Sequence, residues 1–309
     1  MGHHDHHGAQ QDSTQTQGHS HSHGHGHHGH DTEMDWAAMI PHLEQNAEVT
    51  APLYRDAAAW LRELRPAPAT VVDAGSGPGV VSCLLAEEFP GAQVIAMDPE
   101  DALLERAADR AAREGLDGRL RTLRAELPEG IGELPPADLI WAARSLHHVG
   151  NQGAALAALG ERLTPGGALA VLEGGLPARY LPRDLGFGRP GLQARLDATE
   201  AEWFAQMRAG LPGAREAVED WPTLLNAAGL RHMATRTFLL DLPAPLPEAA
   251  RAHVVDQFTR IREGFAEALA PDDKGTLDRL LDPEDPQGLS RRPDLFLLAA
   301  HTVHVAVKE

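Results

Sequence analysis

The fold of this chain is decided by Val71-Val72-Asp73-Ala74-Gly75-Ser76-Gly77-Pro78-Gly79-Val80-Val81. A β-branched run ends in an acid, glycine then stands at every second position, and an apolar helical pattern follows. Because glycine has no Cβ, it tolerates unusual torsions and lets the backbone approach a ligand closely. A strand, a tight turn and a helix start in this order are typical of the place where an α/β sheet holds an adenosine-containing cofactor.

An alternation of strands and helices continues after this turn. Strands are predicted at 70–73, 93–98, 119–125, 137–143 and 168–173, with helices at about 79–89, 100–115 and 151–163 between them. Such βα units indicate a doubly wound, Rossmann-like α/β fold with a mostly parallel sheet. A sixth strand is expected at 231–241, and the apolar run 295–307 is expected to complete a seven-stranded sheet as an antiparallel last strand.

Three segments interrupt or precede this alternation. Residues 34–66 have helical spacing, and Pro41, Pro52 and Pro66 predict that they form short helices in an N-terminal cap. Residues 174–228 hold no clear strand and favour helices at about 191–209 and 215–228. A second helical insertion is expected at 246–282, so that the main domain spans 67–309.

Composition limits the classes of function. The net charge of −18 disfavours nucleic-acid partners and anionic membrane surfaces. Cys83 is the only cysteine, and no apolar run reaches membrane-spanning length, so we expect a soluble, cytoplasmic protein without a membrane partner. The arginine-rich, lysine-poor composition is typical of a high-GC, actinobacterial-type genome. The oligomeric state is left open by these features.

Histidines are concentrated at the N-terminus. Residues 1–30 hold 11 of the 18 histidines, interleaved with Gly, Ser, Gln and Asp, and we expect residues 1–33 to be a disordered tail. Imidazoles at this density bind divalent metals weakly, without forming a defined site. A metal-sensing or storage role is the alternative, and no metal site is predicted in the main domain.

The glycine spacing separates two kinds of adenosine cofactor. The dinucleotide fingerprint G-x-G-x-x-G/A requires Gly or Ala at its third defined position. When the pattern is counted from Gly75, Val80 occupies that position, and when it is counted from Gly77, Ser82 does. Asp98, nineteen residues after Gly79, ends the second strand where a carboxylate binds a ribose diol. The chain also lacks the phosphate-binding G-x-x-x-x-G-K-[ST] pattern.

From residue 70 to about 175 the chain resembles the class I S-adenosylmethionine-dependent methyltransferases. The resemblance implies that Asp73, Gly75, Gly77 and Gly79 form the turn at the methionyl end and ribose of the cofactor. Asp98 matches the acid that binds the ribose hydroxyls, and Pro99 matches the residue that covers the adenine. Glu126 and Leu127 match the adenine-binding segment, where the family more often has Asp. Ser145 opens the matching loop after the fourth strand, and Thr164-Pro165-Gly166-Gly167 matches the turn into the fifth.

The resemblance also implies where methyl transfer occurs. His147 and His148 follow the fourth strand, where the sulfonium should point, and are candidate bases. Glu173, at the end of the fifth strand, is a second polar candidate. Each of the three also has a purely structural interpretation, as a side chain that lines or caps the edge of the sheet. The insertions 174–228 and 246–282 are expected to form the lid over the acceptor.

A locally basic segment follows Glu173. Arg179, Tyr180 and Arg183 are candidate substrate-binding residues, because arginine forks recognise carboxylates and phosphates. The alternative is that these arginines lie on a solvated face, paired to the abundant acids.

Three functions remain open from the sequence. We expect O- or N-directed methyl transfer to a small-molecule or peptide acceptor in specialised metabolism. The first alternative is a methyltransferase that acts on protein or RNA, and the second is a noncatalytic protein that senses S-adenosylmethionine or metal.

Overall fold

A computed structural model describes residues 35–309, so the predicted histidine-rich tail lies outside the described residues. Seven strands form one sheet: β1 (Thr70–Ala74), β2 (Gln93–Asp98), β3 (Leu120–Arg124), β4 (Ala137–Ala143), β5 (Leu163–Arg179), β6 (Arg231–Leu242) and β7 (Leu297–Val307). Eight α-helices accompany them: α1 (Trp36–Leu64), α2 (Val80–Glu88), α3 (Asp101–Arg113), α4 (Gln152–Glu161), α5 (Leu192–Gly210), α6 (Trp221–Ala227), α7 (Glu248–Gly264) and α8 (Pro271–Leu281). Two short 3-10 turns are η1 (Ile131–Glu133) and η2 (Leu146–His148).

The sheet has the strand order β3-β2-β1-β4-β5-β7-β6. β1 to β5 pair in parallel, whereas β7 is antiparallel to both β5 and β6. The predicted seven-stranded sheet with an antiparallel last strand is therefore confirmed. The order reverses between β1 and β4, and ligands of open α/β sheets bind beyond the strand ends at such a switch point.

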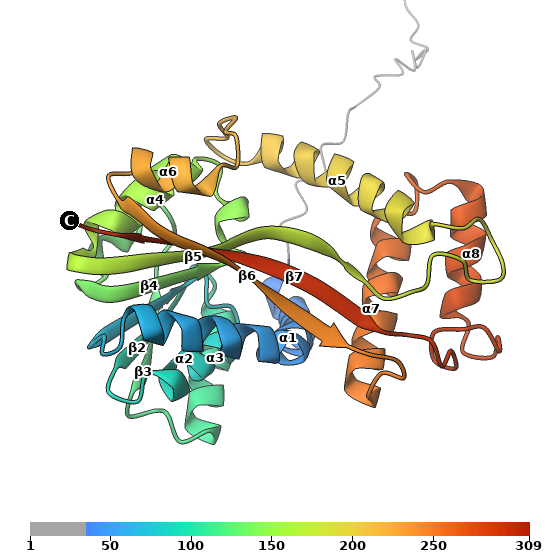
Figure 1. Ribbon diagram of the computed structural model, residues 1–309, viewed down its shortest axis with the longest axis horizontal. Coiled ribbons are helices and arrows are strands. Elements are labelled where there is room, and N and C mark those ends of the chain that lie inside the picture. The colour runs from blue at the N-terminus through green and yellow to red at the C-terminus, as the bar shows by residue number, and fades with distance from the viewer. Residues whose placement is uncertain (1–34) are drawn as a thin grey trace, which may run out of the picture. The chain divides into compact units, whose positions relative to one another are not determined.

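Alternate residues of each strand build two cores on opposite faces of the sheet. Val71 packs in the core that includes α1, α2 and α7, and Val72 packs in the core that includes α4 and α6. Figure 1 shows α2 and α3 on one side of the sheet and α4 and α6 on the other. Both faces of the parallel strands are thus buried, which explains their continuous apolar character.

The N-terminal cap differs from the sequence expectation. Pro41 and Pro52 were expected to divide it into short helices, but α1 runs without a break through both prolines. Nine residues of α1 are buried, including Leu53 and Leu61. This burial outweighs the backbone hydrogen bonds that the two prolines remove, because tertiary packing supplies most of a helix's stability.

Two further boundaries differ from expectation. β5 does not end near Glu173 but continues to Arg179, pairing with β7 across a register shift between Leu172 and Gly175. A Cβ on Gly175 would lie 2.0 Å from the Ala300 carbonyl oxygen, so Gly174-Gly175 marks a bulge inside the strand and not a loop. The helix expected at 215–228 is limited to α6, whose start is capped by Asp220.

The two expected insertions carry helices. α5 matches the helix predicted at about 191–209, and α7 and α8 lie within 246–282. None of the helices that the structure describes is long and apolar enough to cross a membrane.

Candidate active site

The glycine turn lies where β1 ends and α2 begins. Gly75, Gly77 and Gly79 all have positive φ, between 53° and 79°. A Cβ on Gly75 would lie 2.4 Å from Ser145 Cβ, and one on Gly79 would lie 2.6 Å from Ala107 Cβ. A Cβ on Gly77 would meet no atom within 4 Å. Two of the glycines are therefore required by packing, and the third leaves open space beside the backbone.

A cavity of about 250 Å³ lies against this turn, at the carboxyl ends of the central strands. Seven of the nine residues predicted to bind the cofactor line it: Gly75, Gly77, Asp98, Pro99, Glu126, Leu127 and Ser145. Met97, Leu103 and Val149 add apolar wall. Ser145 also donates a 2.9 Å hydrogen bond from its hydroxyl to the Ala74 carbonyl oxygen, which fixes the β4 loop against β1.

Asp98 connects the turn to the next helix. One carboxylate oxygen accepts from the Gly77 amide at 2.9 Å, and the other accepts from the Glu100 amide at 3.1 Å. Burial raises the pKa of Asp98 above its ordinary value. A carboxylate has about four lone-pair sites, so each oxygen keeps capacity for one ligand hydroxyl. This arrangement fits a vicinal diol.

Asp73 and Gly79 support the turn from beneath and do not line the cavity. The Asp73 carboxylate is 2% exposed and accepts a 2.6 Å hydrogen bond from the Ser82 hydroxyl. Burial raises the pKa of Asp73 to about 7, with a further contribution from the Asp98 charge. Gly79 is the residue before α2 and packs on Ala107 of α3.

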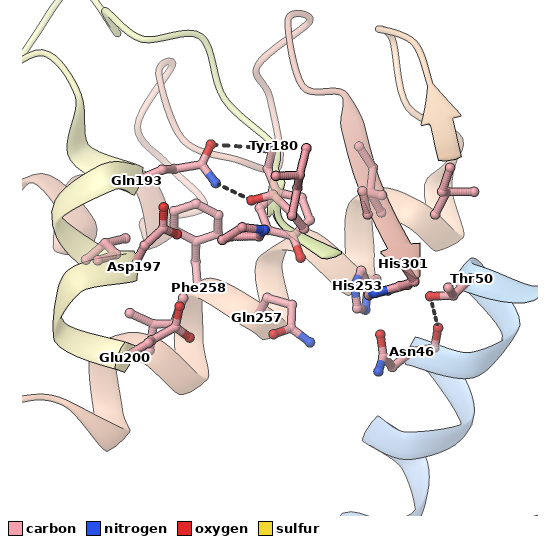
Figure 2. A pocket seen from close by; sticks show the side chains of 18 of the residues that line it. Asn46, Thr50, Tyr180, Gln193, Asp197, Glu200, His253, Gln257, Phe258 and His301 are labelled. Carbon is pink, nitrogen blue, oxygen red and sulfur yellow. Dashed lines mark hydrogen bonds between the residues drawn. The ribbon is translucent and has the colours of Figure 1, made fainter. Parts of the chain in front are cut away.

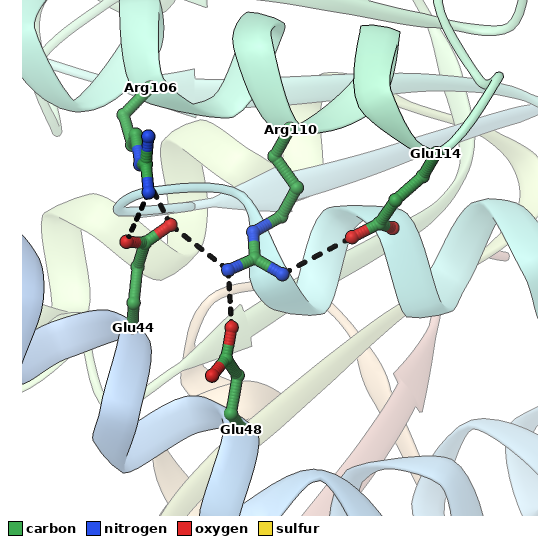
Figure 3. A network of polar contacts seen from close by, with 5 residues as sticks. All are labelled: Glu44, Glu48, Arg106, Arg110 and Glu114. Carbon is green, nitrogen blue, oxygen red and sulfur yellow. Dashed lines mark hydrogen bonds and ion pairs between the residues drawn. The ribbon is translucent and has the colours of Figure 1, made fainter.

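Helix α1 contributes to the cavity through Trp36 and Leu43. A buried ion-pair network fixes this helix to α3 (Figure 3). The Glu44 carboxylate accepts two hydrogen bonds from Arg106, at 2.9 and 2.8 Å, and one from Arg110 at 2.9 Å. Burial alone raises the pKa of Glu44, but the two arginines outweigh it and the net pKa is lowered. The charge on Glu44 therefore stabilises the docked helix.

The three predicted catalytic residues meet at the ends of β4 and β5. His147 Nδ1 lies 3.1 Å from Glu173 Oε2, and Glu173 Oε1 accepts from the Leu146 amide at 3.0 Å. The His148 ring lies against the His147 ring, with centroids 4.2 Å apart and planes tilted by 47°, and His148 also lines the cavity beside the glycine turn. Although His148 has an exposed edge, the burial of its ring lowers its pKa to about 4.

Helix α5 positions the same loop. The Arg208 guanidinium donates hydrogen bonds to the carbonyl oxygens of His147 and Val149, at 2.7 and 2.8 Å. Phe204 of α5 packs against the His147 ring with centroids 5.7 Å apart. The helix that follows β5 in sequence thus helps to shape the site.

Arg144, the first residue after β4, occupies an unusual position. Among residues 35–309 it is the only residue other than glycine with positive φ, at 52°. Arg144 lines three neighbouring cavities, of which one is the cavity beside the glycine turn. Within the part of the chain that the structure describes, no carboxylate forms an ion pair with it. Strained backbone of this kind is concentrated at functional sites.

The second of these cavities, about 520 Å³, lies beside the His147–Glu173 pair. Trp203, Phe204 and Phe265 form an aromatic part of its wall, and Glu200 and His301 also line it. The third cavity, about 290 Å³, extends between α1, β5, α5 and α7 (Figure 2). Arg144, Asp197, Glu200 and His301 border both, so the two form adjoining parts of one chamber.

The predicted substrate-binding residues are dispersed. Arg179 forms an ion pair with Asp197 at 2.6 Å, and Tyr180 lines the third cavity. Arg183 lines a separate small cavity beside Leu185 and Phe296. Arg179 therefore follows the alternative interpretation, in which the arginines of this segment are paired to acids.

Sequence reasoning did not single out Arg144, His253 or His301. Arg144 had a detectable signal, because it lies between the fourth strand and Ser145 at the ligand-binding edge of the sheet. His253 and His301 come from α7 and β7, more than 100 residues later in the chain. Their approach to Arg144 depends on long-range packing that no local pattern encodes.

Comparisons with known proteins agree with this geometry. A family profile described as "Methyltransferase domain" matches residues 72–169. A trans-aconitate 2-methyltransferase of Methylobacterium nodulans is 31% identical over 251 residues, which is 76% of this chain and 88% of the relative. Enzymes of the same name are 32% identical in Paracidovorax citrulli and 31% identical in Methylobacterium radiotolerans, covering 62% and 64% of this chain and 76% and 79% of the relatives.

Proposed function

Because the chain belongs to the class I S-adenosylmethionine-dependent methyltransferases, we propose that its small-molecule acceptor is a carboxylic acid methylated on a carboxylate oxygen. The observation that carries this proposal is Arg144, an arginine without an ion-pair partner among the described residues. It lines both the chamber and the cavity beside the glycine turn, which we call the cofactor cavity because we place S-adenosylmethionine there. A guanidinium binds a carboxylate through two parallel hydrogen bonds. The relatives named above are, by name, trans-aconitate methyltransferases, and trans-aconitate is a carboxylic acid.

The residues that line the cavity beside the glycine turn support specific roles toward the cofactor. Asp98 holds the ribose hydroxyls, Gly77 leaves room beside the methionyl part, and Pro99 and Leu127 cover the adenine. S-adenosylmethionine, when bound, supplies a methyl group activated as a sulfonium. The protein contributes orientation and exclusion of water, which are the main requirements of a displacement on an activated carbon.

The ionisation of the acceptor determines which residues must act. A carboxylic acid is already ionised at neutral pH and needs no base. Arg144 orients it, and the His147–Glu173 pair keeps the loop after β4 in place through the Leu146 amide.

One observation favours a second candidate function. His147 is held by a buried carboxylate and lines the chamber, which is the geometry of an oriented general base. An alcohol or phenol acceptor would require such a base, with His147 taking the hydroxyl proton. This candidate predicts that His147→Gln abolishes turnover, whereas carboxylate methylation predicts a modest loss.

Arg144→Gln and Arg144→Lys test the main proposal. A charge-assisted pair contributes about 1.5–3 kcal/mol, so the Gln variant is expected to lower kcat/KM for a carboxylic acid by roughly 10- to 100-fold. Arg144→Lys keeps the positive charge but loses the two parallel hydrogen bonds of the guanidinium, so its kcat/KM should lie between those of the wild type and Arg144→Gln. The Kd for S-adenosylmethionine, measured by calorimetry, should change little. Arg121→Gln, on exposed β3, is the matched control. An unchanged kcat/KM in Arg144→Gln would exclude the proposed role.

A further inference from the structure

The third cavity contains the remaining polar groups of the chamber (Figure 2). Arg144 lines it together with residues of α1, β5, α5, α7 and β7. Its volume of about 290 Å³ lies near the lower end of the range for small-molecule sites. An acceptor held at Arg144 would therefore place the rest of its structure here.

The charges around this cavity leave no second cation for a second carboxylate. His42 pairs with Asp256, and Arg179 pairs with Asp197. Glu200 adds an acid whose pKa is raised by burial and then by Asp197. Among the described residues that line the cavity, Arg144 at its mouth is the only cation without such a partner.

The two remaining histidines are uncharged at neutral pH. Burial lowers the pKa of His253 to about 4, and Arg144 contributes to this shift. Burial, followed by the nearby Arg144 charge, also lowers the pKa of His301 to about 4. Each neutral ring offers one hydrogen-bond donor and one acceptor, without charge.

A buried ring nitrogen of His253 has no hydrogen-bond partner among the described residues. Its side chain lines the cavity and is 2% exposed, yet Nδ1 is buried and makes no hydrogen bond within the described residues. Leaving a buried polar atom unpaired costs about 1–3 kcal/mol. Asn46 and Gln257 line the same cavity and add uncharged amides. The cavity thus offers neutral hydrogen-bonding groups in addition to the guanidinium.

We propose that the acceptor is a monocarboxylic acid that also carries an uncharged amide, hydroxyl or carbonyl group, and that His253 binds this group while the carboxylate lies at Arg144. This proposal rests on the proposed carboxylate methylation and narrows its substrate class. Asp197 and Glu200 line the same cavity, and Arg144 is its only cation without an ion-pair partner among the described residues, so a second or third carboxylate would have no cation and tricarboxylates should be poor acceptors.

The test measures kcat/KM of the full chain for pairs of acceptors that differ in one group. Each linear dicarboxylic acid from succinic to pimelic acid is compared with its own monoamide. Trans-aconitate and alkyl monocarboxylic acids are measured in the same assay. We expect the best monoamide to exceed its diacid in kcat/KM by about tenfold or more, since a single hydrogen bond and one uncompensated charge separate them. His253→Phe keeps the ring but removes both nitrogens. It should lower kcat/KM for the monoamide by about tenfold and leave the alkyl acid unchanged.

Two further variants test whether misfolding explains a loss of activity in His253→Phe. His253→Asn keeps a hydrogen-bonding group and should restore part of the monoamide preference. His304→Phe changes a histidine of β7 that lines none of the three cavities and should leave all rates unchanged.

The outcomes separate the two proposals. If a diacid or trans-aconitate is methylated as well as the best monoamide, or if His253→Phe slows all acids equally, the assignment of the third cavity is wrong but carboxylate methylation stands. If no carboxylic acid is methylated while S-adenosylmethionine binds, both proposals fail.

Discussion

Gly77 and Gly79 have the same class of backbone torsion but different surroundings, which makes them a matched pair for mutation. Both have positive φ, at 53° and 79°. Alanine at either position incurs the left-handed strain of about 1 kcal/mol. In Gly79→Ala the new Cβ also lies 2.6 Å from Ala107 Cβ and 2.8 Å from Ala107 Cα, so α3 must shift.

Overpacking of this kind costs about 1–3 kcal/mol, so Gly79→Ala should lose roughly 2–4 kcal/mol of unfolding free energy. Gly77→Ala should lose only about 1 kcal/mol, because its Cβ enters open space. That space belongs to the cofactor cavity, so Gly77→Ala should nevertheless weaken S-adenosylmethionine binding by about tenfold or more, ~1.4 kcal/mol.

Urea denaturation and titration calorimetry measure the two effects separately. The expected result is a crossing: one variant loses mainly stability and the other mainly cofactor affinity. Equal stability losses in the two variants would refute the packing argument. Unchanged cofactor affinity in Gly77→Ala would refute the placement of the cofactor beside this glycine.

Further predictions concern Asp98, His253 and Glu44. Asp98→Ala should abolish measurable S-adenosylmethionine binding in calorimetry. It should also lower the free energy of unfolding by about 2–4 kcal/mol, because the Gly77 and Glu100 amides lose their acceptor. A wild-type free energy of unfolding would contradict this. Between pH 6.5 and 4 the unfolded chain takes up a proton at His253 that the folded chain does not, so stability falls as pH falls. His253→Phe should remove up to about 3 kcal/mol of that loss in thermal or urea unfolding, and parallel pH profiles would exclude the effect. Glu44→Gln leaves Arg110 without its buried partner and should lower the free energy of unfolding in urea by about 2–3 kcal/mol. The control is Glu48→Gln, at a side chain that is 55% exposed, and it should cost under about 1 kcal/mol. Equal losses in the two variants would argue against the buried network.

The sequence predicts the sheet well, and seven of the nine proposed cofactor residues line one cavity, because both depend on local signals. The turn at Gly75–Gly79 and the acid at Asp98 are each defined by a few neighbouring residues, and parallel strands bring them to one edge. Local helix propensity gave a wrong prediction where tertiary packing determines the extent of a helix. Pro52 predicted a helix end, but the buried face of α1 holds the helix together.

The acceptor chamber was less predictable for a related reason. Residues 174–228 hold no clear strand in the sequence, yet Gly174-Gly175 forms a bulge that lets β5 extend and carry Tyr180 to the cavity. His253 arrives from α7 through packing over more than a hundred residues of chain. The arginines after Glu173 were the candidates in the sequence, whereas Arg144 is the arginine that lines the chamber, and it has no ion-pair partner among the described residues.

The chemical stability of the transferred methyl group tests the central proposal most directly. Product formed from a carboxylic acid and S-adenosylmethionine labelled on the methyl group should release volatile labelled methanol in mild alkali, because a carboxylate oxygen that accepts methyl becomes an ester. Carboxylate methylation at Arg144 predicts base-labile label with the wild-type chain and a 10- to 100-fold slower appearance of it, roughly 1.5–3 kcal/mol, with Arg144→Gln. Label that stays in the product through alkali, as in an ether or an N-methyl group, would contradict it.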